Sequence, residues 1–159
     1  MSYFKFIIFL LVIFTSNLSI CYAQNHLPSL KGKNIIFVYG GSIHSPKESA
    51  DFFVPILEAE GAKVCVFDNF SVYEDQNLMS ETDLIIQAFT DFFTPVENRM
   101  NDKQFRGLQI AILNGTGFSG WHGGIGASNT VNQRYQFMVG GQFVSCLLYT
   151  SPSPRDLRL

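Results

Sequence analysis

The sequence predicts a single α/β domain in which a mostly parallel β-sheet lies between two layers of helices. Short apolar runs, rich in β-branched and aromatic residues, alternate with segments of helical periodicity along the middle of the chain. Unbroken apolar runs of this kind are typical of strands buried on both faces of a parallel sheet. The chain has 159 residues, which is enough for one domain of ordinary size. The pattern therefore favours a three-layer sandwich.

Three strands are predicted from apolar runs alone. They cover residues 34–39, 63–67 and 83–89. Between the first two, residues 46–60 have the spacing of a helix, with Pro46 at its start. Gly61 is a natural stop for this helix. Pro55 lies inside the helical pattern, so we expect a kink or a restart of the helix there.

The segment 101–114 has two interpretations. The composition of Gln109–Leu113 is compatible with a strand. Asn101 and Gln104, however, have the spacing of a capping box, and the apolar residues after them share one helical face. We prefer the helix, which makes residues 116–121 the next strand.

Residues 1–23 are predicted to be a secretory signal. Lys5 precedes the apolar run Phe6–Phe14, and small residues end the segment at Ala23. The run is shorter than the roughly 20 residues of a membrane-spanning helix, so we expect no stable membrane insertion after cleavage. An uncleaved anchor is the alternative. The interpretation predicts a periplasmic or secreted protein, with residues 24–33 as a linker.

Residues 145–159 break the pattern of the domain. Cys146–Asp156 resembles the translation of a sequencing adaptor, although a genuine Ser/Pro-rich tail is the alternative. We expect the natural protein to continue differently after about Val144. Residues 34–144 would then be a domain truncated at its carboxyl end.

Charge and cysteine content exclude several classes of protein. The chain has 11 Lys and Arg against 13 Asp and Glu and no basic cluster, so a nucleic-acid partner is not expected. Of the three cysteines, Cys21 lies in the predicted signal and Cys146 in the predicted tail. Cys65 alone can form neither an internal disulfide nor a cysteine-based zinc site.

Two glycine-rich segments follow predicted strands, at the sheet edge where such folds bind ligands. Neither has the order of a dinucleotide or phosphate motif, so no nucleotide is implied. Glycines allow backbone N–H groups to approach a ligand, and a tryptophan suits stacking on a sugar ring. Alternatively, the glycines serve only tight turns and the tryptophan packs in the core. The candidate ligand-binding residues are Gly40, Gly41, Trp121, Gly123 and Gly124.

Each of these segments also carries a histidine. His44 and His122 follow two buried strands by a few residues, so we expect them to lie close together, and imidazole suits acid–base chemistry. A histidine bonded to its own loop is the structural alternative. Two ligands are too few for a metal site, and metal use is left open. Glu48 and Asp91 could supply carboxylates.

Three blocks of sequence resemble the ThuA-like (trehalose utilisation) family of the class I glutamine amidotransferase-like superfamily. They are Tyr39–Glu48, Gly115–Gly124 and Tyr135–Val144. The resemblance implies a flavodoxin-like sandwich and a small-molecule carbohydrate ligand.

In the amidotransferases of this superfamily a cysteine nucleophile sits on a strand-to-helix elbow. Alignment with that order places Ser119 at the nucleophile position, so thiolate glutaminase chemistry is not expected. Ser119 itself is a poor candidate, since relatives commonly carry Ala there. Two functions remain: an enzyme acting on a sugar or sugar derivative, with His44 and His122 as catalytic residues, or a non-catalytic carbohydrate-binding or accessory protein.

Overall fold

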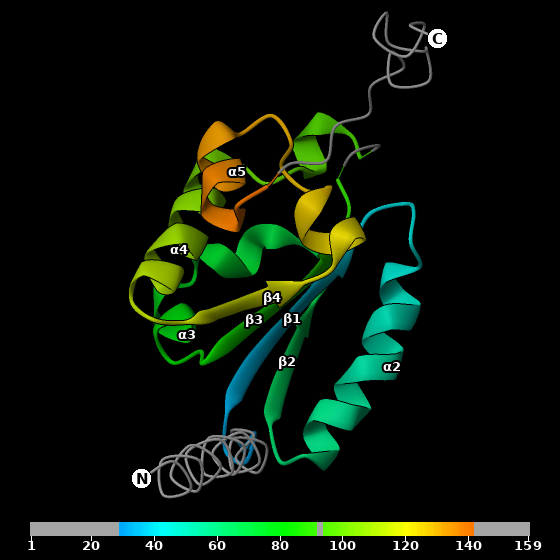
Figure 1. The fold of residues 1–159 in the computed structure, drawn as a ribbon, viewed down its shortest axis with the longest axis vertical. Coiled ribbons are helices and arrows are strands. Elements are labelled where there is room, and N and C mark those ends of the chain that lie inside the picture. The colour runs from blue at the N-terminus through cyan, green and yellow to red at the C-terminus, as the bar shows by residue number, and fades with distance from the viewer. Residues whose placement is uncertain (1–28, 92–93, 142–159) are drawn as a thin grey trace, which may run out of the picture.

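The computed structural model describes residues 29–91 and 94–141 (Figure 1). The predicted signal 1–23 and the predicted tail 145–159 lie outside the described residues, and both stay predictions. Within the described ranges, no helix combines the length and the apolarity needed to cross a bilayer.

Four parallel strands form the sheet, in the order β2-β1-β3-β4. The sequence predicts these four strands and a mostly parallel sheet, with strand ends that differ by one residue at most, but it does not predict their order. The central strand β1 pairs with β2 along one side and with β3 along the other. The strands are β1 (Asn34–Gly40), β2 (Lys63–Phe67), β3 (Leu84–Phe89) and β4 (Gly117–Gly120).

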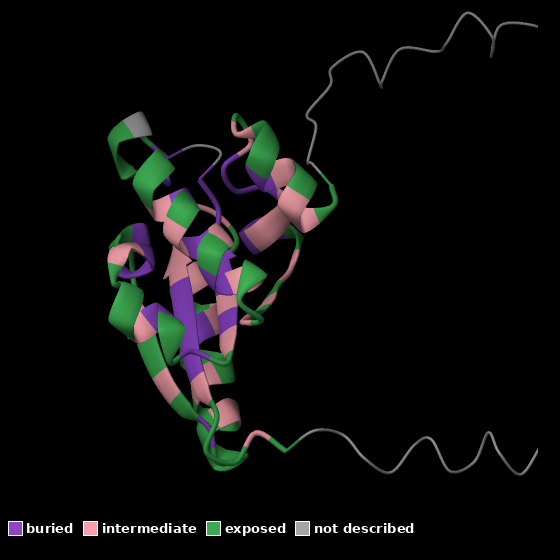
Figure 2. Cartoon of the chain, turned by 90° about the vertical axis from the view of Figure 1, so that its left-hand side faces the viewer, coloured by how far each residue is buried: buried purple, intermediate pink, exposed green. Residues whose placement is uncertain are grey.

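Helices cover both faces of the sheet, which confirms the three-layer sandwich (Figure 1). On one face, α2 (Pro46–Ala59) packs through Ala50 on Phe37 and Ala88. The other face carries the larger core, where α4 (Asp102–Leu113) places Phe105 and Leu108 among the buried side chains. Figure 2 shows the buried residues concentrated along the strands between these layers. The consecutive buried residues Ile35–Val38 of the central strand β1 are what a sheet covered on both sides requires.

Helix α4 confirms the preferred interpretation of residues 101–114. The Asn101 side chain accepts hydrogen bonds from the backbone N–H groups of Lys103 and Gln104, and the Gln104 side chain accepts one from the N–H of Asn101. This complete capping box satisfies donors that the first helical turn leaves unpaired. The local signal was strong enough to decide between helix and strand.

The expected restart at Pro55 is wrong, because α2 continues through this residue. A proline inside a helix removes one N–H donor, here the donor to the carbonyl of Asp51. Both Pro55 and Asp51 are exposed, so the loss falls on the solvent side of the helix. On the opposite side Val54 and Leu57 pack against the sheet and hold the helix in place.

The sequence analysis missed the helical turns between β2 and β3. Two parallel strands cannot be joined by a tight turn, and the connection here contains the 3₁₀ turn η2 (Phe70–Glu74) and the short helix α3 (Gln76–Ser80). Asn69 caps the first and Asp75 caps the second. These turns bring Phe70, Val72 and Tyr73 into the larger core.

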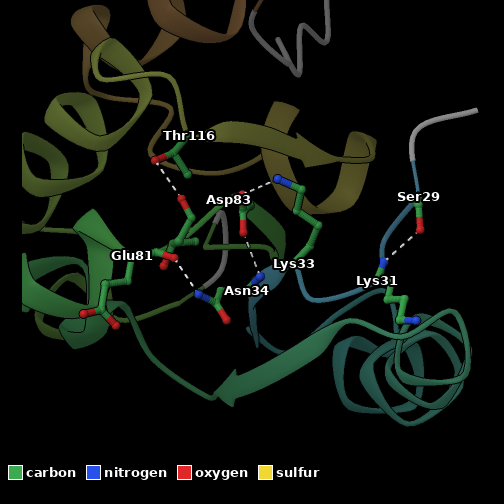
Figure 3. A network of polar contacts seen from close by, with 8 residues as sticks. Ser29, Lys31, Lys33, Asn34, Glu81, Asp83 and Thr116 are labelled. Carbon is green, nitrogen blue, oxygen red and sulfur yellow. Dashed lines mark hydrogen bonds and ion pairs between the residues drawn. The ribbon is translucent and has the colours of Figure 1, made fainter.

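The amino end of the sheet is closed by polar contacts around Asp83 (Figure 3). Its carboxylate accepts hydrogen bonds from Lys33 Nζ at 2.7 Å and from the backbone N–H of Asn34 at 2.8 Å. These two partners hold the pKa of the Asp83 carboxyl below its usual value. The Thr116 hydroxyl donates to the carbonyl of Thr82 and joins the start of β4 to β3. The opposite, carboxyl end of the sheet carries the candidate site.

Candidate functional site

The two histidines singled out in the sequence meet at the carboxyl end of the sheet. His44 lies in the loop after β1, and His122 begins η4 (His122–Gly126), the turn after β4. Their ring centroids are 6.2 Å apart with an edge-to-face orientation. Both side chains are exposed, so a ligand from solvent can reach them. The expected proximity of His44 and His122 is confirmed.

His44 is held in an uncommon backbone conformation. Its φ is 69°, and that of Ser45 is 47°, so two consecutive non-glycine residues occupy the left-handed region. Such residues cost energy and are frequent at functional sites. Ser45 ends the loop by accepting hydrogen bonds at its carbonyl from the N–H and the hydroxyl of Ser49 in α2. The left-handed conformation of His44 and Ser45 therefore costs energy, and the hydrogen bonds at the start of α2 help to stabilise it.

Gly123 leaves the space that His44 occupies. A Cβ atom at position 123 would lie 2.7 Å from Cδ2 of the His44 ring. Real Cβ atoms do not come so close to another heavy atom, so the imidazole packs directly on the glycine backbone. The glycine identity at position 123 thus sets how near the two histidine loops can come.

The turn that carries His122 is a single π-helical turn. Its wide ring is closed by a hydrogen bond of 3.0 Å from the N–H of Ala127 to the carbonyl of His122. Single π turns are rare and occur often at functional sites. This one contains Gly123 and Gly124, which are both buried.

Gln87 of β3 anchors this turn to the sheet. The side chain is fully buried, and its Nε2 donates to the carbonyl of Gly124 at 2.9 Å and to the hydroxyl of Tyr135 at 3.0 Å. Its Oε1 accepts from the hydroxyl of Tyr73 at 2.9 Å. The Tyr135 hydroxyl donates in turn to the carbonyl of Ile125. Burial raises the pKa of both tyrosine hydroxyls, so both stay protonated and able to donate.

A second anchor lies beyond the end of β3. Both carboxylate oxygens of buried Asp91 accept from the N–H of Asn129, at 2.9 and 2.8 Å. The Ser128 hydroxyl donates to the carbonyl of Phe89. Burial raises the pKa of the Asp91 carboxyl, although the Asn129 N–H and the charge of Arg99 oppose this change. The sequence singled out Asp91 as a carboxylate for acid–base work, and the structure places it in this anchor.

The predicted ligand-binding glycines make close contacts within the protein. A Cβ at Gly40 would meet the Phe89 ring at 2.2 Å, and one at Gly41 would meet the carbonyl of Thr90 at 2.0 Å. At Gly124 it would meet the carbonyl of Gln87 at 2.1 Å. These glycines allow strand ends and loops to approach one another, which agrees with the turn-forming alternative in the sequence analysis.

Trp121 packs between two phenylalanines. Its ring centroid is 5.4 Å from that of Phe53 and 6.4 Å from that of Phe37. This is the packing role that the sequence analysis kept as an alternative to stacking on a sugar. The contact with Phe53 joins α2 to Trp121, the residue that immediately precedes η4.

The other candidates lie apart from the strand-to-turn elbow. Ser119 is inside β4, where it pairs with Ile86 of β3, so the elbow position falls on Trp121 and His122. Glu48 is exposed in the first turn of α2. Cys65 is exposed in β2 and forms no disulfide. Among residues 29–91 and 94–141, no three His, Cys, Asp or Glu side chains are grouped closely enough to hold a metal ion.

Comparison with protein families agrees with this geometry. The family model described as "ThuA: Trehalose utilisation" matches residues 34–156. The chain belongs to the ThuA family. The match ends at residue 156, inside the segment 145–159 that the sequence analysis assigns to the tail. No curated protein and no solved structure matches the chain.

A series of glycine substitutions tests how the histidine loops of this ThuA domain are packed. Gly123→Ala should displace the exposed His44 ring, with a loss of stability below about 1 kcal/mol. Gly124→Ala should cost about 1–3 kcal/mol, because its Cβ would collide with the backbone of β3. Gly126→Ala is the matched control, since its Cβ would meet only the His122 ring at an ordinary 3.9 Å. Ring NMR signals of His44 and urea unfolding measure both effects; an unchanged His44 signal in Gly123→Ala would refute the packing.

The stability contributions of the Asp91 and Asp83 carboxylates should respond to pH in opposite directions. The raised pKa of Asp91 means that the folded protein binds more protons than the unfolded chain, so its contribution to stability falls as pH rises above about 4. Asp91→Asn should therefore become more stable relative to the wild type as pH rises through this window. For Asp83, whose pKa is lowered, the stabilising contribution is lost as pH falls below about 4. Urea unfolding of both Asn variants between about pH 3 and 7 checks the signs, and parallel curves would contradict them.

Proposed function

We propose that the chain is an exported enzyme that acts on a sugar or sugar derivative in trehalose utilisation, with His44 and His122 as its proton-transferring residues. The observation that carries the proposal is the edge-to-face contact of the two imidazoles, 6.2 Å between centroids, at the carboxyl end of the sheet. Ligands of open α/β sheets bind at this end. Membership of the ThuA family supplies the link to carbohydrate.

The pair suits chemistry at a hydroxyl group. An imidazole can accept a proton from a sugar hydroxyl or donate one to a leaving oxygen at neutral pH. Two imidazoles in contact can divide these roles, one as the base and the other as the acid. The exposure of both rings leaves the reacting proton within reach of a ligand on the loop surface.

A specific observation favours the second candidate function, a non-catalytic carbohydrate-binding or accessory protein. Ser119 lies within a strand, and the elbow where amidotransferases hold their nucleophile is occupied by Trp121 and His122. Trp121 is in turn engaged by Phe37 and Phe53. Under this interpretation the two histidines would bind a sugar by hydrogen bonds without proton transfer.

Substitution of each histidine separates the two functions. We expect His44→Gln and His122→Gln to lower the turnover of trehalose or a derivative of it by about 10²–10⁴-fold, as for other acid–base residues. The melting temperature should change little, because both side chains are exposed. His26→Gln, in the predicted linker, is the matched control for these two variants.

Export is tested separately. The protein should be recovered from periplasm or medium, and N-terminal sequencing should find Gln24 first.

The outcomes divide as follows. Loss of turnover with unchanged sugar affinity supports the enzyme. Sugar binding without any turnover, abolished by either substitution, supports the binding protein. A fall in melting temperature with no change in binding or turnover would show that the histidines are structural, and would contradict both functions.

A further inference from the structure

A separate cavity opens at the same end of the sheet, on the side of the larger core. Its volume is about 320 Å³, and it forms where the loops after β1, β2 and β3 meet. Gly41 comes from the first loop, Asp68 and Asn69 from the second, and Arg99 from the third. Neither histidine lines it.

The position of this cavity follows from the topology. After β1 the chain crosses to α2 on one face, and after β3 it continues to α4 on the other. The point where consecutive crossovers diverge leaves a crevice between neighbouring strand ends, which is the usual ligand site of such sheets. Gly41, at the start of the loop after β1, lines the cavity, and His44 lies further along the same loop.

The floor of the cavity is apolar and its rim is polar. Phe70 and Phe89 line it, both nearly fully buried, with ring centroids 4.0 Å apart. At the rim, Oδ1 of Asp68 accepts from Asn69 Nδ2 at 2.8 Å. Within the described part of the chain, no hydrogen bond or ion pair engages the side chains of Glu97 or Asn98, which leaves a carboxylate and an amide available to a ligand.

The rim is also held in place before any ligand arrives. Oδ1 of Asn69 accepts from the N–H and the hydroxyl of Ser71, which fixes the start of η2. Nε of Arg99 donates to the carbonyl of Thr94 at 2.8 Å and closes the loop after β3. A rim that is ordered in advance saves the entropy that a flexible loop would lose on binding.

The lining selects one class of ligand. Carboxylates accept hydrogen bonds from hydroxyl groups, and an amide both accepts and donates them, so this rim suits a ligand with several hydroxyl groups. The lining has two carboxylates, of Asp68 and Glu97, and one guanidinium, of Arg99. This excess of negative charge disfavours the binding of an anion. The volume is at the small end for ligand pockets, which suits one sugar ring better than a nucleotide.

We propose that this cavity is a subsite for one pyranose unit, held at Asp68, Glu97 and Asn98 over the Phe70–Phe89 floor. The inference rests on the proposed carbohydrate function but concerns other residues than the histidine pair. It gives the chain two sugar-contacting regions that share the loop after β1.

Calorimetric titration of the full chain with glucose and with trehalose tests the subsite. We expect Asp68→Asn and Glu97→Gln each to weaken glucose binding by about tenfold or more, because each removes an ionised acceptor of a hydroxyl hydrogen bond. Asn98→Ala tests the amide. Glu58→Gln is the matched control, an exposed carboxylate in α2 outside the cavity. Far-UV circular dichroism and melting temperature establish that each variant is folded.

The results distinguish this inference from the proposed function. Weaker sugar binding in the cavity variants, with unchanged binding in the histidine variants, supports the subsite, and turnover then decides the role of the histidines. Sugar binding that depends on the histidines alone overturns the subsite and leaves the proposed function intact. Absence of glucose and trehalose binding to the wild type also overturns it, as does calcium binding that Asp68→Asn abolishes while no sugar binds.

Discussion

The buried side chain of Gln87 is the interaction on which the arrangement of the site depends. One amide joins four parts of the fold, because it binds Tyr73 of η2, Gly124 of η4 and Tyr135 of α5 (Gln133–Val139) while its backbone belongs to β3. An unpaired amide at this depth would cost stability, so all its partners must be in place together. The turn that carries His122 is therefore positioned by the centre of the sheet.

Two glycines also help to position the histidine loops. Gly124 lets the turn approach the Gln87 backbone, and Gly123 accepts the His44 ring against its own backbone. The loops after β1 and β4 can then meet at the two histidines. At the same end of the sheet, the loops after β1, β2 and β3 surround the cavity. The carboxyl end of the sheet thus carries two polar regions that share one loop, while the amino end is closed by Asp83 and its partners.

Local signals predicted the sheet, α2, α4 and the proximity of His44 and His122. Apolar runs, helix caps and the ends of strands can all be recognised from residues that are close together in the sequence. Contacts between distant residues could not be predicted in this way. Gln87 stands in an apolar strand, and a polar residue there signals a buried partner, but its partners lie 14, 37 and 48 positions away. The same limit applies to Gly123, whose need for glycine comes from His44. The short turns of η2 and α3 have too few residues for a helical period, although their caps at Asn69 and Asp75 were readable.

The most direct measurement is the NMR cross-relaxation between the ring protons of His44 and His122 in the wild type and in Gln87→Met. Methionine is of similar size but has no amide, so Tyr73 and Gly124 lose their partner while the strand is kept. We expect ring-to-ring cross-peaks in the wild type, consistent with centroids 6.2 Å apart, and their loss in the variant. The amide signals of β1 and β2 should stay unchanged and serve as the internal control. Cross-peaks of undiminished intensity in Gln87→Met would contradict the claim that Gln87 places His122 beside His44.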